Sequence, residues 1–313
     1  MKDGRMIRVG IKFIVLFTIL YLPALQVFAT PPENTISVGS ISVSSKEEIE
    51  VWQPFVNYLA VKLEGQGIKQ GRMVVAESIH EMADLLLAGE VDLFIDSPFP
   101  CAMVCRLSGC RPILRRWKEG LAEFHGVIFV RHDSGINDLE DLVGKMVAFK
   151  RLFSSFGYMY PKAMLLQEGY ILKKHETFND SVSPGQIGYI FSNSNEASLW
   201  QVLEKKVAAA AFQGDKLEKL SGFRRQELKI IKRSIDVPRH VVCRSSKMKA
   251  ELVASCEQVM MAMEQDNEGK LILEEFRHTA KFDRFPKGVE ATFTPIEKLV
   301  SLIEEEYSLP NSK

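Results

Sequence analysis

Residues 149–161, FKRLFSSFGYMYP, connect a predicted strand to a predicted helix near the middle of this chain. The apolar run 146–149 indicates a buried strand, and the pattern PKAMLLQEGY from Pro161 onward indicates a helix. A serine pair beside a glycine at a helix start can bind an anion, because the first backbone amides of a helix lack partners and carry partial positive charge. The same serines can instead cap the helix. The residues alone leave both interpretations open.

Strand and helix patterns alternate on both sides of this connection. Residues 35–43 alternate apolar and polar side chains as a strand does, and residues 49–63 carry apolar side chains at helical spacing. A strand at 72–76, a helix that begins with the capping-box spacing of 78–81, and a strand at 91–95 follow. This order predicts an α/β protein with mixed, mostly parallel sheets covered by helices. The length and the repetition of such blocks favour two lobes.

The first 29 residues predict a secretory signal peptide that is cleaved. Four basic residues precede the apolar run 13–22, and residues 27–29 supply the small side chains that a signal peptidase reads. An uncleaved membrane anchor is the alternative, because residues 13–29 are just long enough to span a bilayer, but Pro23 favours cleavage. Removing this segment takes away four basic residues and one acidic residue, so the remainder is slightly acidic. Bulk charge therefore gives no support for binding to nucleic acid or to a membrane surface.

Five cysteines follow the predicted signal peptide: Cys101, Cys105, Cys110, Cys243 and Cys256. In an oxidising compartment an odd count leaves at least one of them unpaired. The first two share one face of a predicted helix and the third lies just beyond it, which allows a local disulfide that involves Cys110. A three-thiolate metal site is the alternative, but no histidine or aspartate lies at ligand spacing nearby. We expect buried cysteines with one disulfide, and neither a metal nor a cofactor.

Several segments, in this order, resemble the substrate-binding proteins of phosphate/phosphonate-type ABC transporters, a branch of the type II periplasmic binding proteins. The segments are 91–93 leading into 97–100, 131–136 with 141–149, and 154–158 with Pro161. Members of this family typically carry a hydroxyl-rich Ser-Thr-Ser-Gly segment. Here Ser155 stands in place of the threonine, and Phe156 stands in place of the third hydroxyl.

The resemblance implies a Venus-flytrap architecture, in which two α/β lobes close on a ligand held in the cleft between them. Lobe 1 would comprise residues 30–125 plus 239–313, and lobe 2 would comprise residues 126–238. The chain would cross between the lobes near 124–130 and 237–244. The resemblance also implies a periplasmic or secreted protein that delivers a small-molecule ligand to an ABC permease, and we expect a monomer.

On lobe 2, the resemblance places the anionic end of the ligand at Ser154, Ser155, Gly157 and Tyr158. Serine hydroxyls donate hydrogen bonds, and a glycine lets the backbone approach a ligand closely. The preceding pair Lys150–Arg151 would clamp a phosphate if it points inward, and would be solvated otherwise. The expected ligand is small, polar and oxyanionic, of the phosphate or phosphonate kind.

Candidate residues also lie in other parts of the chain. Asp96 and Ser97 end a predicted strand, where ligands of open α/β sheets bind, although an Asp-Ser-Pro turn explains them equally well. A carboxylate at position 96 would repel a dianion unless it is protonated or paired. Asn195 can donate a hydrogen bond from lobe 2, and Ser42 can reach the cleft from lobe 1. By the resemblance, aminoalkyl-phosphonate binders usually carry an acid where Ala208 stands, which argues against an aminophosphonate.

Two other kinds of protein share this architecture. A ligand-sensing module for a receptor or sensor kinase has the same two lobes, and the residues do not separate it from a transport protein. An enzyme is disfavoured, because the chain lacks a Gly-x-Ser-x-Gly elbow, a Walker loop and a His-Glu-x-x-His motif, which leaves Asp96 as the only catalytic candidate. We therefore predict a solute-binding protein and not an enzyme.

Overall fold

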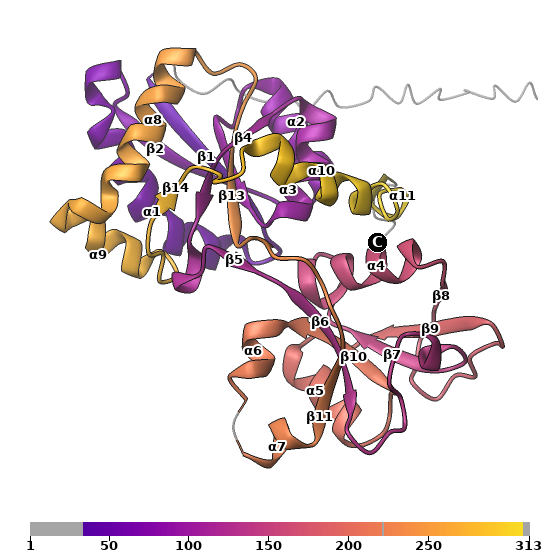
Figure 1. Cartoon of the computed structure of the whole chain (residues 1–313). Coiled ribbons are helices and arrows are strands. Elements are labelled where there is room, and N and C mark those ends of the chain that lie inside the picture. Colours follow the sequence, from indigo (N-terminus) through magenta and orange to yellow (C-terminus); the bar gives the residue numbers. More distant parts are fainter. Residues whose placement is uncertain (1–33, 221, 309–313) are drawn as a thin grey trace, which may run out of the picture.

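The computed structural model describes residues 34–220 and 222–308, so the predicted signal peptide at 1–29 lies outside the described residues. Figure 1 shows two α/β lobes joined by crossing segments of the chain, with helices packed against the sheet of each lobe. No helix in the described ranges is long and apolar enough to cross a membrane.

One lobe, which we call lobe 1, is built on a six-stranded sheet. Its strands are β1 (Thr35–Ile41), β2 (Gln70–Ala76), β3 (Leu93–Asp96), β4 (Arg111–Arg116), β13 (His240–Arg244) and β14 (Phe282–Asp283). Across the sheet their order is β14-β4-β13-β3-β1-β2. β1 runs parallel to β2 and β3, whereas β13 runs antiparallel to β3 and β4. Two late strands thus complete a sheet that the N-terminal part of the chain begins.

Helices cover both faces of this sheet (Figure 1). They are α1 (Ser45–Lys62), α2 (Ile79–Ala88), α3 (Pro98–Ser108), α8 (Ala250–Ala262), α9 (Asn267–Glu275) and α10 (Val289–Val300), with 3-10 turns at Glu64–Gln66, Lys118–Gly120 and Met263–Gln265. On one face α1, α8 and α9 bury Trp52, Phe55 and Leu273. On the other, α2, α3 and α10 bury Phe99 and Phe293. Both faces of the sheet are therefore buried from solvent, as is usual for a sheet with parallel strands.

The helix start predicted from the capping-box spacing of 78–81 is confirmed, because Ser78 is the N-cap of α2, but Glu81 bonds to the residue before the cap and not to the cap itself. The amide of Glu81 donates to Ser78 Oγ at 3.1 Å, and the Glu81 carboxylate accepts from the amide of Glu77 at 2.8 Å. Gly89, with a φ of 81°, ends the helix. Local signals at both ends therefore define this helix.

The second lobe, lobe 2, is built on another six-stranded sheet. Its strands are β6 (Gly126–Arg131), β7 (Met146–Phe149), β8 (Ile171–Lys174), β9 (Gln186–Phe191), β10 (Ala209–Gln213) and β11 (Leu228–Arg233), in the order β11-β6-β10-β7-β9-β8. β10, β7, β9 and β8 run parallel to one another, and β6 is antiparallel to both β10 and β11. Its helices are a π-helical turn at Ser155–Met159 that continues as α4 (Tyr160–Gln167), α5 (Asn195–Leu203), α6 (Gly214–Glu218) and α7 (Phe223–Gln226), with a 3-10 turn at Glu140–Leu142.

The chain passes between the lobes in two paired segments. β5 (Glu123–Phe124) and β12 (Val237–Pro238) form a short antiparallel pair between the two larger sheets. Both lie within or beside the segments that we expected to cross. We keep residues 30–125 plus 239–313, and 126–238, as the proposed lobe boundaries.

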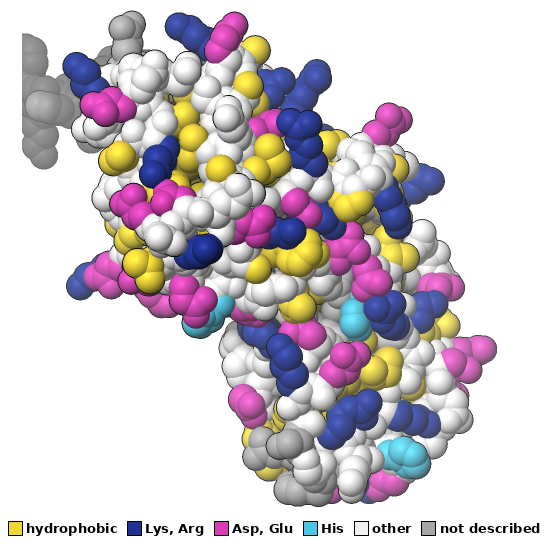
Figure 2. Space-filling model, turned by 60° about the vertical axis from the view of Figure 1, so that its left-hand side comes forward, with side chains coloured by type: hydrophobic (Ala, Val, Ile, Leu, Met, Phe, Trp, Pro, Cys, Tyr) yellow, Lys and Arg dark blue, Asp and Glu magenta, His cyan; other side chains and the backbone are white. Residues whose placement is uncertain are grey.

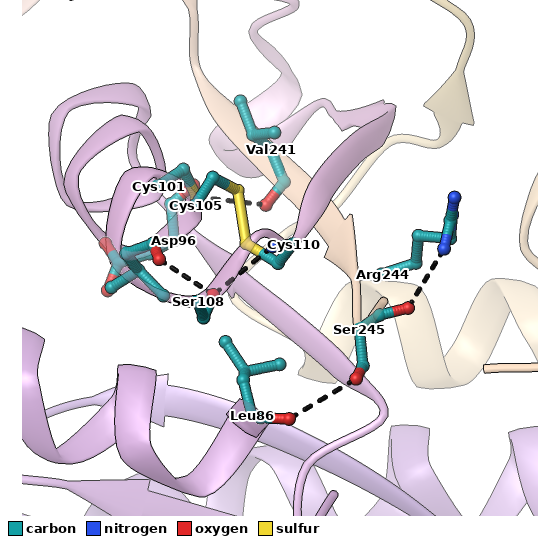
Figure 3. Close-up of a disulfide and its surroundings, with 10 residues drawn as sticks. Leu86, Asp96, Cys101, Cys105, Ser108, Cys110, Val241, Arg244 and Ser245 are labelled. Atoms are coloured by element: carbon teal, nitrogen blue, oxygen red, sulfur yellow. Dashed lines mark hydrogen bonds between the residues drawn. A yellow bond between two sulfur atoms is a disulfide. The ribbon is translucent and has the colours of Figure 1, made fainter. Parts of the chain in front are cut away.

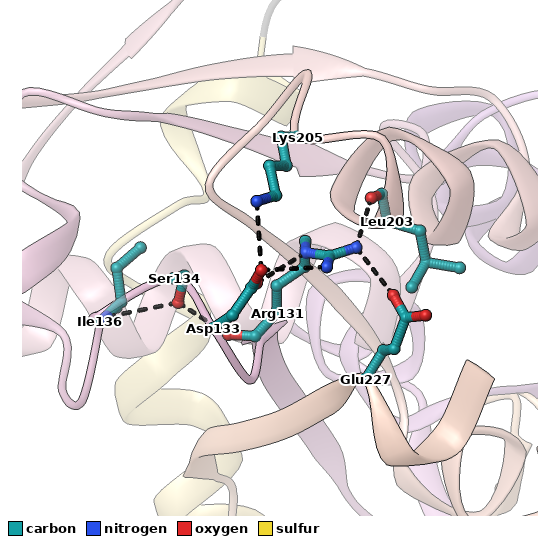
Figure 4. Close-up of polar contacts among 7 residues, drawn as sticks. All are labelled: Arg131, Asp133, Ser134, Ile136, Leu203, Lys205 and Glu227. Atoms are coloured by element: carbon teal, nitrogen blue, oxygen red, sulfur yellow. Dashed lines mark hydrogen bonds and ion pairs between the residues drawn. The ribbon is translucent and has the colours of Figure 1, made fainter. Parts of the chain in front are cut away.

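An ion-pair network anchors the segment that follows β6, which is one of the segments that carry the resemblance. Figure 4 shows Arg131 between Asp133 and Glu227, with the carbonyl of Leu203 as a third acceptor. Lys205 pairs with Asp133 from the other side at 3.1 Å. Because these contacts tie β6 to the end of α5 and to the start of β11, the segment has a structural role in lobe 2.

The expected local disulfide is present: Cys105 in α3 is bonded to Cys110, just before β4 (Figure 3). Cys101, Cys243 and Cys256 are free and buried. Within the described ranges, a set of sulfur atoms close enough to share a metal is formed by Cys105, Cys110 and Cys243. Two of these three sulfurs are bonded to each other, so they do not form a three-thiolate set.

Candidate ligand-binding cleft

A cavity of about 600 Å³ lies between the lobes and is lined by residues of both. This volume falls within the range typical of pockets for small molecules. Seven of the predicted site residues line it: Ser42, Asp96, Ser97, Ser154, Ser155, Gly157 and Asn195. Tyr158 does not, because its side chain is fully buried and its hydroxyl donates to Glu306 at 2.7 Å.

The start of the helix at Ser155–Met159 forms the wall of the cavity on lobe 2. Ser154 caps this helix, since its Oγ accepts from the amide of Gly157 at 3.1 Å. No acceptor among the described residues takes the amides of Ser155 and Phe156. Such free first-turn amides attract anions. The capping interpretation is confirmed for Ser154, whereas anion binding at the free amides beside it stays a prediction.

Gly157 is required at this helix start by its close neighbours. A Cβ at this position would lie 2.5 Å from Lys150 Cβ and 2.6 Å from Ser154 Oγ. The backbone also closes on itself here, because the amide of Lys150 donates to the Gly157 carbonyl at 2.8 Å. This contact folds the strand exit back onto the helix start and holds Lys150 against the cavity.

Phe156 stands where the resemblance led us to expect a hydroxyl, and it packs against the crossing segment. Its ring lies 4.0 Å from that of Phe124, centroid to centroid, in an edge-on arrangement. A Cβ on Gly126 would lie 2.6 Å from the Phe156 ring. At the point where the chain passes between the lobes, Phe156 therefore provides apolar packing in place of a hydroxyl.

The two lobes meet at Ser97 and Ser155, whose hydroxyl oxygens lie 2.7 Å apart. The amide and the hydroxyl of Ser97 also lie 2.6 and 3.0 Å from Asp96 Oδ1. Burial raises the pKa of Asp96 to about 6, while the hydrogen bonds from Ser97 and the charge of Lys118 oppose that rise. With a pKa of about 6 this carboxylate is mostly ionised at neutral pH, and the hydrogen bonds from Ser97 stabilise its charge.

Three cations on lobe 2 line the cavity, and we call Lys150, Arg151 and Lys216 the lobe 2 wall. Lys150 is half-buried, and the other two are exposed. None of the three forms an ion pair with a described residue. Burial, followed by the charges of Arg151 and Lys216, lowers the pKa of Lys150. The acids that line the cavity, Glu47, Glu48, Glu77 and Asp96, all belong to lobe 1.

Lobe 1 contributes a second group of basic residues that the sequence reasoning missed, Lys118, Arg239, His240 and Arg277. Lys118 Nζ lies 3.2 Å from His240 Nε2. Burial, with the charges of Arg239, Arg116 and Arg277, lowers the pKa of Lys118 to about 7. Burial, and then the charge of Lys118, lowers the pKa of His240 well below its usual range, so its imidazole is neutral.

A sequence signal existed for some of these basic residues. Lys118, Arg239 and His240 lie within a few residues of the two crossing segments, where both lobes must come together. Arg277 had no such signal, because it enters from the loop after α9 with a φ of 54°. On the face that Figure 2 shows, basic and acidic side chains are interspersed over both lobes.

Comparisons with known proteins identify the family and the fold of this chain. The family described as "ABC transporter, phosphonate, periplasmic substrate-binding protein" matches residues 38–286. The phosphate-import protein PhnD of Mycolicibacterium smegmatis is 26% identical over 172 residues, which are 53% of this chain. The match spans 50% of that relative, so the chain aligns with about half of its length.

Two solved structures share the fold. XAC2383 from Xanthomonas citri bound to ATP has a TM-score of 0.80 at 21% identity, over 88% of this chain and 100% of that one. PhnD1 from Prochlorococcus marinus in complex with methylphosphonate has a TM-score of 0.60 at 15% identity, over 87% of this chain and 99% of that one. Identities this low establish the two-lobed fold and nothing about the ligand.

Proposed function

This chain belongs to the periplasmic substrate-binding proteins of phosphonate ABC transporters, and we propose that it captures a small oxyanion of the phosphate or phosphonate class in the cleft between its lobes. Proteins of this family bind a small molecule and deliver it to an ABC permease. They are binding proteins and not enzymes, and they work outside the cytoplasm. We propose the same role for this chain, with a cleaved signal peptide at 1–29 and a monomeric mature form.

The observation that carries the proposal is the lobe 2 wall. Three cations without an ion-pair partner among the described residues line the cavity there, and no acid of the same lobe lines it. The free amides of Ser155 and Phe156 lie in the same wall. Cationic side chains and free amides stabilise an oxyanion through charge-assisted hydrogen bonds, and they would have no partner in a site for a neutral or cationic solute.

A thermal-shift screen of the mature protein tests this function. The screen compares phosphate, phosphite and methylphosphonate at saturating concentration. At least one of these anions should raise Tm by about 5 °C or more, because a ligand that binds only the folded state stabilises it. The paired change Lys150→Gln and Arg151→Gln should remove most of that shift. Lys205→Gln, which removes a cation from the network in Figure 4, serves as the control for net charge and should leave the shift intact. A neutral or cationic solute that stabilises the protein while every oxyanion fails would overturn the proposal.

A further inference from the structure

The basic residues of lobe 1 form a site of their own around Lys118. The ammonium of Lys118 lies against the neutral ring of His240, and Arg239 and Arg277 line the same part of the cavity. Arg116 lies behind them, fully buried, with its guanidinium stacked on Phe276 at 3.5 Å. Burial, and then the charges of Arg239 and other nearby arginines, lowers the pKa of both Lys118 and Arg116, so these cationic side chains lie close together.

The carboxylates near this cluster already have partners. Glu48 accepts from Arg277 at 2.8 Å and from the Ser40 hydroxyl at 3.0 Å. Glu119 pairs with Arg239 at 3.1 Å. No carboxylate oxygen among the described residues lies within ion-pair distance of Lys118, and Asp96 bonds to Ser97 instead.

Polar atoms of the same cluster also lack partners. Arg239 and His240 are 6% and 7% exposed, and neither Arg239 Nε nor His240 Nδ1 has a hydrogen-bond partner among the described residues. A buried donor without a partner is costly, and native proteins usually satisfy such groups with a ligand or with water. The cluster thus has the charge and the free donors of an anion site.

A single phosphonate on the lobe 2 wall would leave Lys118 without a counter-charge, because Glu48 and Glu119 already pair with Arg277 and Arg239. The wall and the cluster line one cavity from opposite lobes. The cavity of about 600 Å³ is also far larger than such an anion, given that a water molecule takes about 30 Å³ in the liquid. Two cationic sites that face one cavity repel each other unless negative charge lies between them.

We propose that the ligand is an organic molecule with two phosphate-like groups, one bound by the lobe 2 wall and the other by Lys118, Arg239 and His240 of lobe 1. This inference rests on the proposed function and narrows its ligand class from a simple phosphonate to a bis-anion. The carbon chain between the two groups would occupy the middle of the cavity. Binding would then draw the lobes together, because each lobe holds one end of the same molecule.

The test measures affinities by titration calorimetry for methylphosphonate and for methylene-, ethylene- and propylene-bisphosphonate. At least one bisphosphonate should bind roughly tenfold or more tightly than methylphosphonate, since the second group adds charge-assisted hydrogen bonds. The linker that gives the best affinity then reports the spacing of the two sites. Lys118→Gln should weaken that bisphosphonate several times more than it weakens methylphosphonate.

The Lys118→Gln variant should fold, because Lys118 is only half-buried and its charge is disfavoured in the folded protein. Lys205→Gln again controls for net charge, and should change no affinity. The inference is overturned if every bisphosphonate binds no better than methylphosphonate, or if Lys118→Gln weakens both kinds of ligand equally. If phosphate, phosphite and all four of these anions fail to bind while a neutral or cationic solute binds, the proposed function is overturned instead, so the two failures are distinguishable.

Discussion

At the scale of single residues, the protonation of Lys118 links ligand binding to pH. Its pKa is lowered to about 7 by burial and by Arg239, Arg116 and Arg277, with Asp96 acting in the opposite direction and neutral His240 beside it. An anion bound next to Lys118 favours the charged ammonium and therefore raises this pKa. Affinity is then highest below pH 7, where Lys118 is already charged, and falls as the pH rises above 7.

We predict that the wild type binds a bisphosphonate more tightly than Lys118→Gln does at pH 6. This advantage, expressed as the wild-type affinity divided by the variant affinity, should fall as the pH rises to about 9. Both proteins meet the same ligand, so the ligand's own titration cancels and the ratio isolates Lys118. Asp96, whose pKa is about 6, ionises at the lower end of this range and is present in both proteins. Calorimetric titrations at several pH values measure the ratio. A ratio that is constant across the range would show that Lys118 carries no ligand-linked proton.

At the scale of elements, the helix start at Ser155–Met159 depends on Gly157. The contact between this glycine and Lys150 turns the end of β7 back onto the helix, and the amide of Gly157 satisfies the capping serine. A methyl group here meets two neighbours at distances that real Cβ atoms do not tolerate, so either the cap or the strand exit must move. Lys150 and Arg151 of the lobe 2 wall lie on this strand exit.

We predict that Gly157→Ala lowers the free energy of unfolding by about 1–3 kcal/mol, as overpacking does at a crowded site. It should also weaken methylphosphonate or phosphate binding roughly tenfold, which corresponds to one hydrogen bond to a charged group. Urea unfolding and calorimetry measure the two effects. Gly65→Ala is the matched control, because nothing lies within 4 Å of a Cβ at that position, and it should change neither quantity. Equal behaviour of the two variants would contradict the role given to Gly157.

Local elements were predictable from the sequence where their signals are local. The N-cap Ser78 and Gly89 define α2, and the apolar run before Lys150 is β7, as the patterns predicted. The group of lobe 1 cations was not predictable in this way, because it forms only when β13 enters between β3 and β4 and brings His240 beside Lys118. A local sequence pattern cannot predict this strand order, because Lys118 and His240 are far apart in the sequence. The inward position of Lys150 likewise depends on a backbone contact with Gly157 that no side-chain pattern reveals.

At the scale of the whole molecule, the two lobes are joined by more than the crossing strands. One apolar cluster contains buried residues of both lobes, and the rings of Phe99 in α3 and Tyr160 in α4 lie 5.0 Å apart. Figure 1 shows α10 and the C-terminal α11 (Glu305–Ser308) reaching from lobe 1 toward α4 of lobe 2. The C-terminal part of the chain therefore bridges the lobes.

Polar contacts complete this bridge on lobe 2. The Glu306 carboxylate accepts from the Lys162 ammonium and from the Tyr158 hydroxyl, and the Tyr307 hydroxyl donates to the carbonyl of Leu152 at 2.6 Å. Lys162 is only 7% exposed, so its charge depends on Glu306 for a counter-ion. On lobe 1, Arg106 of α3 pairs with Glu304 in the same C-terminal segment. The C-terminal segment therefore contacts lobe 1 through Glu304 and lobe 2 through Glu306 and Tyr307.

We predict that Glu306→Gln uncouples the lobes, so that a single calorimetric unfolding transition separates into two. It should also lower the free energy of unfolding by about 1–3 kcal/mol, less than for a fully buried pair because the Glu306 side chain is 32% exposed. Glu305→Gln, one residue earlier and exposed, is the matched control and should melt like the wild type. Adding Lys162→Met to Glu306→Gln should recover part of the lost stability, because no buried charge is then left unpaired. If Glu306→Gln melts in one transition at the temperature of its control, the C-terminal segment does not couple the lobes.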